Sequence, residues 1–265
     1  MSTTAPTSAD GAERPLLPHE AYVPGHHWRN AEDEAEGAKL GMWLFLSTEV
    51  LLFAGFFCAY AAFRLMYPEN WHNASRYYLD WEIGAANTGV LLLSSFTIVL
   101  AIRAAQQGNR GMILLNLLIT NLCALFFLIV KIVYEYIPKI NKGALPGGFY
   151  DYAPKEGDPS APAALAGTLA EQGAHILPAA AKAAGDAAAF TPMPHDHIFL
   201  SVYWISTATH GIHVLVGVFV ITWCMWKAAL HHYGPKHYTS LENVGLYWHL
   251  VDVIWIFLFP LLYLV

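Results

Sequence analysis

The sequence predicts an all-α integral membrane protein, a helical bundle with five transmembrane helices. Of its 265 residues, 56% are hydrophobic and only 13% are charged, whereas a soluble domain has about 25% charged residues. The apolar residues gather in five runs, each near or above the ~20 residues that cross a bilayer as a helix. Because the bilayer interior offers no water to the backbone, each run is expected to be helical.

The predicted helices form two groups along the chain. A polar tail, residues 1–39, precedes three helices in residues 40–137, and two more helices fill residues 198–265. Residues 138–197 therefore connect the third helix to the fourth. The individual spans are expected at residues 40–63, 83–102, 112–137, 198–226 and 244–265.

The connecting segment 138–197 is rich in Ala, Pro and Gly and could pass for a sixth span. It contains Glu171, Lys182 and Asp186, and Pro178 lies near the middle of its alanine-rich part. It also has few large apolar side chains, which favours short surface helices or partial disorder. We therefore predict a long external insert between helices three and four.

The basic residues of the short loops predict the orientation of the chain. Arg103 and Arg110 flank the loop after the second span, and Lys227 and Lys236 lie in the loop after the fourth. Basic loops remain on the cytoplasmic side. The N-terminus is then expected in the cytoplasm and Val265 outside.

Several function classes lack their usual signals. The net charge is −6 and no basic patch indicates nucleic-acid binding. The N-terminal region has no basic stretch followed by an apolar core, so no cleavable signal peptide is expected. There is no nucleophile elbow, phosphate loop or dinucleotide fingerprint. Attention falls instead on ionisable residues inside the predicted spans.

Glu49 lies in "GMWLFLSTEVLLFAGFF", nine residues after the predicted start of the first span. At 1.5 Å per residue it lies roughly 14 Å along the helix axis, close to the middle of the membrane. A charge there is unfavourable by at least about 2.5–3.5 kcal/mol. Glu49 is therefore either a structural carboxyl bonded to a neighbouring helix or a proton-linked, regulatory carboxyl.

Two histidine-containing pairs share a spacing of three residues. His210 and His213 lie in "STATHGIHVLVG", and His249 and Asp252 lie in "YWHLVDVIW". This spacing puts both members of a pair on one helix face. Two histidines alone do not close a metal site, so hydrogen bonds between helices are the expected role of all four side chains.

Two further groups of polar residues lie near span ends. Lys131 and Glu135 are four residues apart, as expected of a lysine that snorkels beside an interfacial glutamate. His195, Asp196 and His197 precede the fourth span, where they could form a surface metal site or an interfacial polar collar.

These segments together resemble subunit III of cytochrome c oxidase, in the haem–copper oxidase family. The matching stretches occur in family order and cover residues 40–137 and 198–265. They are "GMWLFLSTEVLLFAGFF", "NTGVLLLSSFTIVLA", "VYEY", "STATHGIHVLVGVF" and "YWHLVDVIWIFLFPLLYL".

The resemblance implies a non-catalytic subunit of a proton-translocating oxidase. Such a subunit carries no cofactor of its own; haem a and copper are expected in partner subunits. It packs directly on subunit I, with subunit II in the same complex, and it binds phospholipid while supporting proton uptake. Cytochrome c or extra subunits could contact the external insert. Longer relatives have seven helices around a lipid-filled cleft, and this chain is similar to a five-helix form.

The resemblance also assigns roles to individual residues. Glu49 falls on the buried, carbodiimide-reactive carboxyl of the family, and Lys227 falls near a lipid headgroup where relatives often have arginine. Interhelical polar positions of the family motifs fall on Glu135, His210, His213, His249 and Asp252. The "STE" around Glu49 resembles the branch of the family that oxidises cytochrome c, which implies an aa3-type cytochrome c oxidase. Subunit III of a quinol oxidase is the alternative.

Two readings from other classes remain open. A proton-coupled transporter could use Glu49, His210, His249 and Asp252 as a relay, but it predicts repeats and broken helices that the sequence does not display. A membrane metallo-oxygenase would need more ligands on one side of the membrane.

Overall fold

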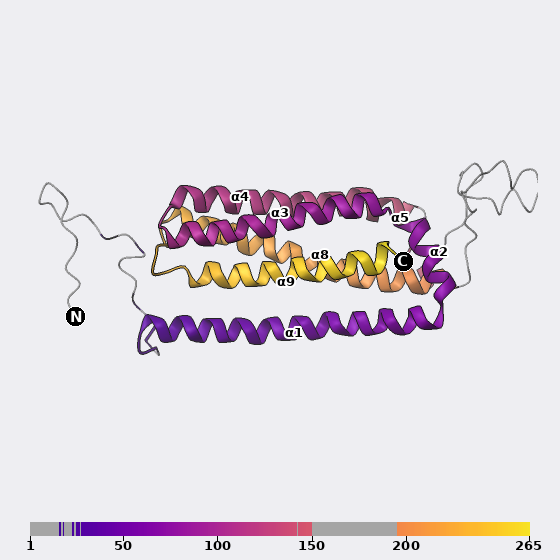
Figure 1. The fold of residues 1–265 in the computed structure, drawn as a ribbon, viewed down its shortest axis with the longest axis horizontal. Helices are drawn as coiled ribbons and strands as arrows, with labels where there is room; N and C mark the ends of the chain where they lie inside the picture. Colours follow the sequence, from indigo (N-terminus) through magenta and orange to yellow (C-terminus); the bar gives the residue numbers. More distant parts are fainter. Residues whose placement is uncertain are drawn as a thin grey trace, which may run out of the picture. The chain divides into compact units, whose positions relative to one another are not determined.

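The computed structural model describes residues 28–141, 143–149 and 195–265, together with residues 16, 18, 23, 25 and 26. Within these residues the regular structure is helical, and one isolated bridge joins Gly234 to His237. Figure 1 traces the helices in chain order. They are α1 (Ala31–Met66), α2 (Pro68–Tyr78), α3 (Trp81–Gln106), α4 (Arg110–Val130), a π-helical turn η1 (Lys131–Tyr136), α5 (Ile137–Asn141), a 3-10 turn η2 (Gly147–Phe149), α8 (Asp196–Ala229) and α9 (Thr239–Tyr263).

Five continuous helical stretches are long and apolar enough to cross a membrane, which confirms the predicted fold class. The third stretch, Arg110–Asn141, is made of α4, η1 and α5, and the other four are single helices. Large apolar side chains such as Trp43, Phe96 and Phe219 lie exposed along these helices. In a bilayer such side chains face lipid or another subunit, because lipid tails solvate them as well as protein does.

The helices are longer than the apolar runs that predicted them. Helix α1 begins at Ala31, so residues 31–39, expected as part of the polar tail, are helical. The Asn30 side chain accepts a hydrogen bond from the Asp33 N–H at 2.7 Å. Acidic side chains in the first turn add a favourable interaction with the helix dipole.

Residues 65–82, which lie between the first two predicted spans, contain the helix α2. Pro68 occupies the first turn, where its missing N–H removes no hydrogen bond. Trp71, Ala74, Ser75 and Tyr78 are buried at the spacing of one helix face. This amphipathic pattern explains why a polar, interrupted segment folds as a helix.

The chain divides into two compact units. The first consists of Met1–Phe53, Ala86–Ile129 and Thr209–Phe257, and the second of Ala54–Ala85, Val130–Ala208 and Leu258–Val265. Each long helix contributes a segment to both units.

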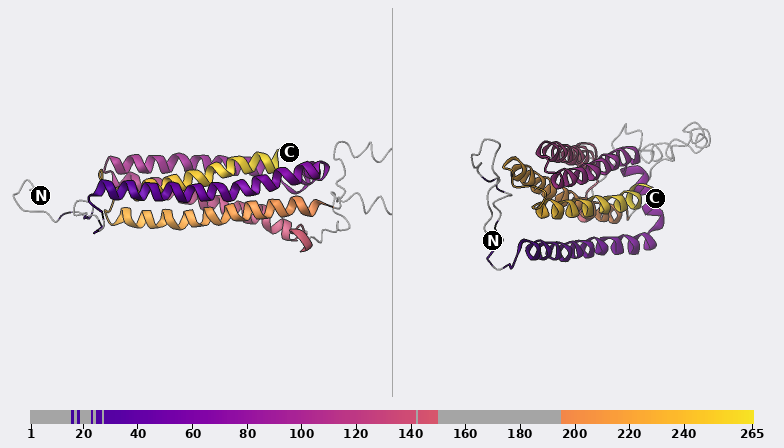
Figure 2. Two further views of the ribbon diagram at one scale, coloured as in Figure 1. Left: turned by 90° about the horizontal axis from the view of Figure 1, so that it is seen from below. Right: turned by 60° about the vertical axis from the view of Figure 1, so that its left-hand side comes forward.

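In the first unit, segments of the five long helices run roughly parallel to one another (Figures 1 and 2). Trp248 is fully buried, and its indole N–H donates to the Ser94 hydroxyl at 3.0 Å. A Cβ placed on Gly217 would come within 2.5 Å of the Trp248 ring, so the glycine permits this packing. The hydroxyls of Thr97 and Thr120 are 2.7 Å apart and join α3 to α4.

The second unit has an aromatic core around Trp71 of α2. Its ring meets Tyr60 of α1 and Phe199 of α8 edge-on, at centroid distances of 5.4 and 5.2 Å. The C-terminal carbonyls of α9 accept hydrogen bonds from the Tyr60 hydroxyl and, at 2.6 Å, from the Ser75 hydroxyl. These bonds satisfy groups that a helix end leaves without intrahelical partners.

Candidate functional site

Glu49 and His213 form a hydrogen-bonded pair between α1 and α8 in the first unit. Glu49 Oε2 lies 2.7 Å from His213 Nε2, and both side chains are largely buried, at 16% and 17% exposure. The other ring nitrogen, Nδ1, lies 2.7 Å from the carbonyl oxygen of Thr209. The sequence placed these residues in different spans without pairing them, since they are 164 positions apart.

The geometry of this pair requires one shared proton. The Thr209 carbonyl can only accept, so Nδ1 of His213 carries a hydrogen. The bond at Nε2 then has two forms: a neutral carboxylic acid donating to a neutral imidazole, or an imidazolium donating to a carboxylate. Both forms hold the same number of protons. The pair can therefore stay neutral overall in a membrane while its proton moves between two atoms.

His213 is further fixed by aromatic neighbours. The Tyr247 hydroxyl donates to the His213 backbone carbonyl at 2.9 Å. The ring of Phe53 meets the imidazole edge-on, with centroids 5.4 Å apart. The Phe53 contact and the bond of Nδ1 to Thr209 limit the rotation of the imidazole, whereas the Tyr247 bond holds the backbone.

His210 is surrounded by aromatic rings and takes no part in the bond between His213 and Glu49. Its side chain is 1% exposed. It stacks on Trp255 of α9 with centroids 5.1 Å apart, and Phe127 of α4 meets it edge-on at 5.7 Å. The pair expected to share a face thus contributes to two different sets of contacts between helices.

His249 and Asp252 of α9 also have separate surroundings. His249 Nδ1 lies 2.7 Å from the hydroxyl of Ser95 on α3. Asp252 is 2% exposed, and among the described residues neither of its carboxyl oxygens has a hydrogen-bond partner. The two side chains are therefore not bonded to each other, and the residue that bonds His249, Ser95, was not singled out in the sequence.

Glu135 is the centre of a buried polar cluster in the second unit. Its Oε2 accepts hydrogen bonds from Lys131 Nζ at 2.6 Å and from the hydroxyls of Tyr203 and Tyr263, each at 2.5 Å. Lys131 Nζ also donates to the Tyr263 hydroxyl, and Lys139 Nζ lies 3.8 Å from Oε2. The cluster joins η1 and α5 to α8 and α9.

The expectation that Lys131 snorkels is wrong. The Lys131 and Glu135 side chains are only 2% and 3% exposed, because they point into the protein. The π turn η1 begins at Lys131 and contains both residues. No local pattern could have identified Tyr203 and Tyr263 as partners, since they lie 68 and 128 positions from Glu135.

Lys227, the predicted headgroup residue, lies near the end of α8 in the first unit. Its ammonium lies 4.5 Å from the centroid of the Trp223 ring and 5.6 Å from that of Tyr233. The Ser240 hydroxyl is 3.4 Å away. Burial raises the pKa of the Tyr233 phenol above its usual range, so Tyr233 stays neutral and offers its ring to the lysine.

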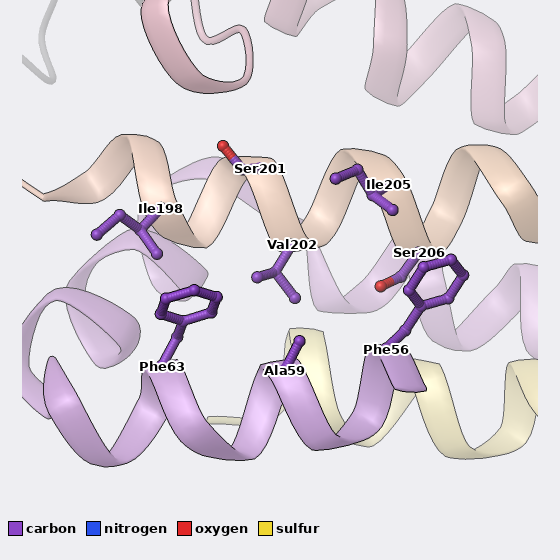
Figure 3. A pocket seen from close by; sticks show the side chains of 8 residues that line it. All are labelled: Phe56, Ala59, Phe63, Ile198, Ser201, Val202, Ile205 and Ser206. Carbon is purple, nitrogen blue, oxygen red and sulfur yellow. The ribbon is translucent and has the colours of Figure 1, made fainter. Parts of the chain in front are cut away.

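An apolar groove lies between α1 and α8 in the second unit (Figure 3). Its volume is about 320 Å³. The Ser206 hydroxyl lies between the two helices, whereas the Ser201 hydroxyl points away from α1 and accepts a hydrogen bond from the Gly147 N–H at 2.9 Å. The lining residues are Phe56, Ala59, Phe63, Ile198, Ser201, Val202, Ile205 and Ser206.

His195 precedes α8, and Asp196 and His197 lie in its first turn. Within the described ranges, no three His, Cys, Asp or Glu side chains are placed to hold a metal ion. Asp196 accepts a hydrogen bond from Asn70 at 3.2 Å, and the rings of His195 and Tyr67 are 4.7 Å apart. These contacts fit the polar-collar interpretation better than the metal-site one.

Comparison with known proteins agrees with the motifs that these sites contain. The family model described as cytochrome c oxidase subunit III matches residues 17–145 and 180–265. The chain is 29% identical over 249 residues to cytochrome c oxidase subunit 3 of Mammuthus primigenius, and 27% identical over the same length to those of Prototheca wickerhamii and Homo sapiens. Each match covers 92% of this chain and 74% of the relative. The chain therefore belongs to the cytochrome c oxidase subunit III family.

Proposed function

We propose that this chain is the non-catalytic subunit III of an aa3-type cytochrome c oxidase in aerobic respiratory electron transport. The observation that carries the proposal is the family match, which includes all five membrane-spanning stretches. In this role the chain packs on subunit I, which with subunit II contains the haem a and copper centres. Oxygen is reduced in subunit I, and this chain stabilises subunit I.

The proposed location is the inner membrane of a bacterial cell, with the N-terminus in the cytoplasm. The support is the distribution of basic residues. Arg103 lies in the last turn of α3, and Arg110 is the first residue of α4. Lys227 lies near the end of α8, and Lys236 lies in the loop between α8 and α9. Basic loops stay on the cytoplasmic side.

Glu49 is proposed as a proton-linked carboxyl that supports proton uptake by the complex. Its bond to His213 allows one proton to move between the carboxyl and the imidazole without a change in the charge of the pair. A group of this kind can hold a proton inside the membrane, where a lone charge would be unstable.

The remaining polar positions are proposed to hold the helices together. Glu135 contacts α8 and α9 through two tyrosines, and His210 contacts α4 and α9 through aromatic rings. His249 contacts α3 through Ser95. Subunit I would then meet a set of helices whose packing is fixed by these contacts.

Phospholipid is the proposed ligand of the chain, at two places described separately. Lys227 is partly exposed at the end of α8 and carries the charge that a headgroup phosphate needs. The groove of the second unit is lined almost wholly by apolar side chains and has room for part of a hydrocarbon chain. Lysine binds phosphate as a point charge rather than through two parallel hydrogen bonds, so the headgroup contact is expected to be salt-sensitive.

A mild-detergent purification of the tagged chain tests the proposal. We expect it to bring along two larger oxidase subunits, identified by mass spectrometry, and a reduced-minus-oxidised spectrum of haem a. Oxidation of reduced cytochrome c, rather than of a quinol, by the same sample would support the electron donor. A colourless chain without partners would contradict the proposal and favour a proton-coupled transporter.

A further inference from the structure

Asp252 stands apart from the other buried carboxyls because the structure gives its oxygens no donor. The Glu49 carboxyl is bonded by His213 and the Glu135 carboxyl by a lysine and two tyrosines. Among the described residues, both oxygens of Asp252 lack a hydrogen-bond partner, and the residue is in none of the ion pairs. The residue is only 2% exposed in this chain alone. A partner subunit would therefore find almost no surface through which to reach it.

The donors nearest along α9 are already used elsewhere. Trp248 and Trp255 lie one turn to either side of Asp252 and are both 0% exposed. The Trp248 indole N–H donates to Ser94, and the Trp255 indole N–H donates to Thr88 at 2.9 Å. Neither N–H can turn towards the carboxyl without breaking a bond to α3.

Ser95 is a polar side chain of α3 beside the Asp252 carboxyl. Its hydroxyl lies 2.7 Å from His249 Nδ1 and is occupied by that bond. The titratable neighbour on α9 is His249, one turn before Asp252. On α8 the titratable side chain is His210, which stacks on Trp255. No Lys or Arg among the described residues pairs with Asp252.

These surroundings suit an uncharged carboxyl. An ionised carboxylate is stable in a protein interior only when a cation or several hydrogen-bond donors replace the water it has lost. Here the indole N–H groups one turn to either side of Asp252 are bonded to other acceptors. A neutral carboxylic acid has a much smaller desolvation penalty and needs no counter-ion.

We propose that Asp252 is a proton-binding site: a neutral carboxylic acid that exchanges its proton with His249 through the Ser95 hydroxyl. His249 is partly exposed, so it provides the route to the outside of the buried acid. In the exchange, the Ser95 hydroxyl, which has no hydrogen bond to Asp252 in the structure, first turns its oxygen towards the acid. Asp252 Oδ–H then transfers its proton to Ser95 Oγ while the Ser95 hydroxyl proton passes to His249 Nδ1. The O–H bond of Asp252 breaks, an N–H bond forms, and a carboxylate and an imidazolium result. This site is separate from the Glu49–His213 pair and does not depend on the proposed function.

Infrared spectroscopy of the purified complex tests the protonation state. The infrared spectrum of the wild type is expected to contain one carboxylic-acid C=O band that the spectrum of Asp252→Asn lacks. This band should shift to lower frequency in D₂O. Loss of carboxylate bands instead, with no acid band, would overturn the proposal and indicate an ionised side chain paired with a cation. Asp80→Asn, at an exposed position before α3, is the matched control and should remove only carboxylate bands.

Isotope labelling keeps the test decisive if Asp252→Asn does not assemble. Wild-type protein labelled with ¹³C at the aspartate carboxyl should show an isotope-shifted acid band that persists in Asp196→Asn, the variant of another buried aspartate. Absence of such a band would refute a neutral Asp252.

The exchange route is tested separately with Ser95→Ala. The acid band should remain, but its shift in D₂O should become several-fold slower because the hydroxyl that relays the proton is gone. An acid band that shifts at the wild-type rate would overturn the role of Ser95 and His249.

Discussion

The buried cluster around Glu135 predicts a large, rescuable loss of stability. In Glu135→Gln the amide oxygen can still accept from Tyr203 and Tyr263, but the Lys131 ammonium, 2% exposed, loses its counter-charge. Removing one partner of a buried ion pair destabilises a protein by about 3–5 kcal/mol. For a chain of this size the midpoint of thermal unfolding should fall by about 6–20 °C.

The second variant makes the reasoning quantitative. Adding Lys131→Met to Glu135→Gln removes the nearer of the two ammonium groups that lose Glu135 as a counter-charge, so the loss should shrink to about 1–3 kcal/mol. The other ammonium, of Lys139, keeps its hydrogen bond to the Glu135 backbone carbonyl. Two deleterious changes would thus be better tolerated together than the first alone. Such non-additivity is the signature of a direct charge pair.

Unfolding can be followed by the labelling of Cys224 with a thiol-reactive fluorophore in mild detergent. This thiol is 0% exposed in the folded chain, so it reacts only on unfolding, once the other two cysteines are replaced by alanine. Glu242→Gln is the control, because the Lys39–Glu242 pair is 2.8 Å long but lies at the surface, with Lys39 47% exposed. It should lose less than about 1 kcal/mol. If Glu135→Gln behaved like this control, or if Lys131→Met gave no rescue, the cluster would not be a stabilising ion pair.

Two further predictions concern the first unit. Glu49→Gln should preserve assembly, because the amide can donate to His213 Nε2, but it should abolish labelling of this chain by a carbodiimide; labelling at the wild-type stoichiometry would show that another carboxyl reacts. Gly217→Ala should destabilise the chain by about 1–3 kcal/mol through overpacking, since its Cβ would lie 2.5 Å from the Trp248 ring. The control is Gly211→Ala, whose Cβ would have no atom of another helix within 4 Å among the described residues and which should be close to neutral in the same unfolding assay.

The sequence was sufficient for the membrane-spanning helices because apolar length alone decides them. It was less informative about helix ends. Residues 31–39 and α2 are helical for reasons other than hydropathy: capping and acidic residues in one case, an amphipathic face in the other. The α2 pattern is visible in the sequence once buried positions at one-face spacing are sought in a polar segment.

The individual residues of the candidate sites could be predicted from the sequence, but the hydrogen bonds between them could not. Glu49 and His213 were recognisable because ionisable side chains are rare inside a span. Their bond depends on how α1 lies against α8, which no local pattern contains. Ser95, Tyr203 and Tyr263 were missed for a related reason: hydroxyl side chains are common in membrane helices, and only their distant partners make these three distinctive.

The π turn at Lys131–Tyr136 also sets the rotational phase of the helix that follows it. Residues eight apart, such as Lys131 and Lys139, would be offset by about 80° around an uninterrupted α-helix. One inserted residue in a π turn reduces that offset to about 20°, so both ammonium groups reach Glu135 from one side. Deleting a single residue from this turn would restore a regular α-helix and put Lys139 seven residues after Lys131, at the same offset of about 20°. If the turn became a regular α-helix without that deletion, Lys139 and the chain beyond it would instead swing by about 100°. The π turn therefore accommodates one extra residue while it keeps the following helix in phase.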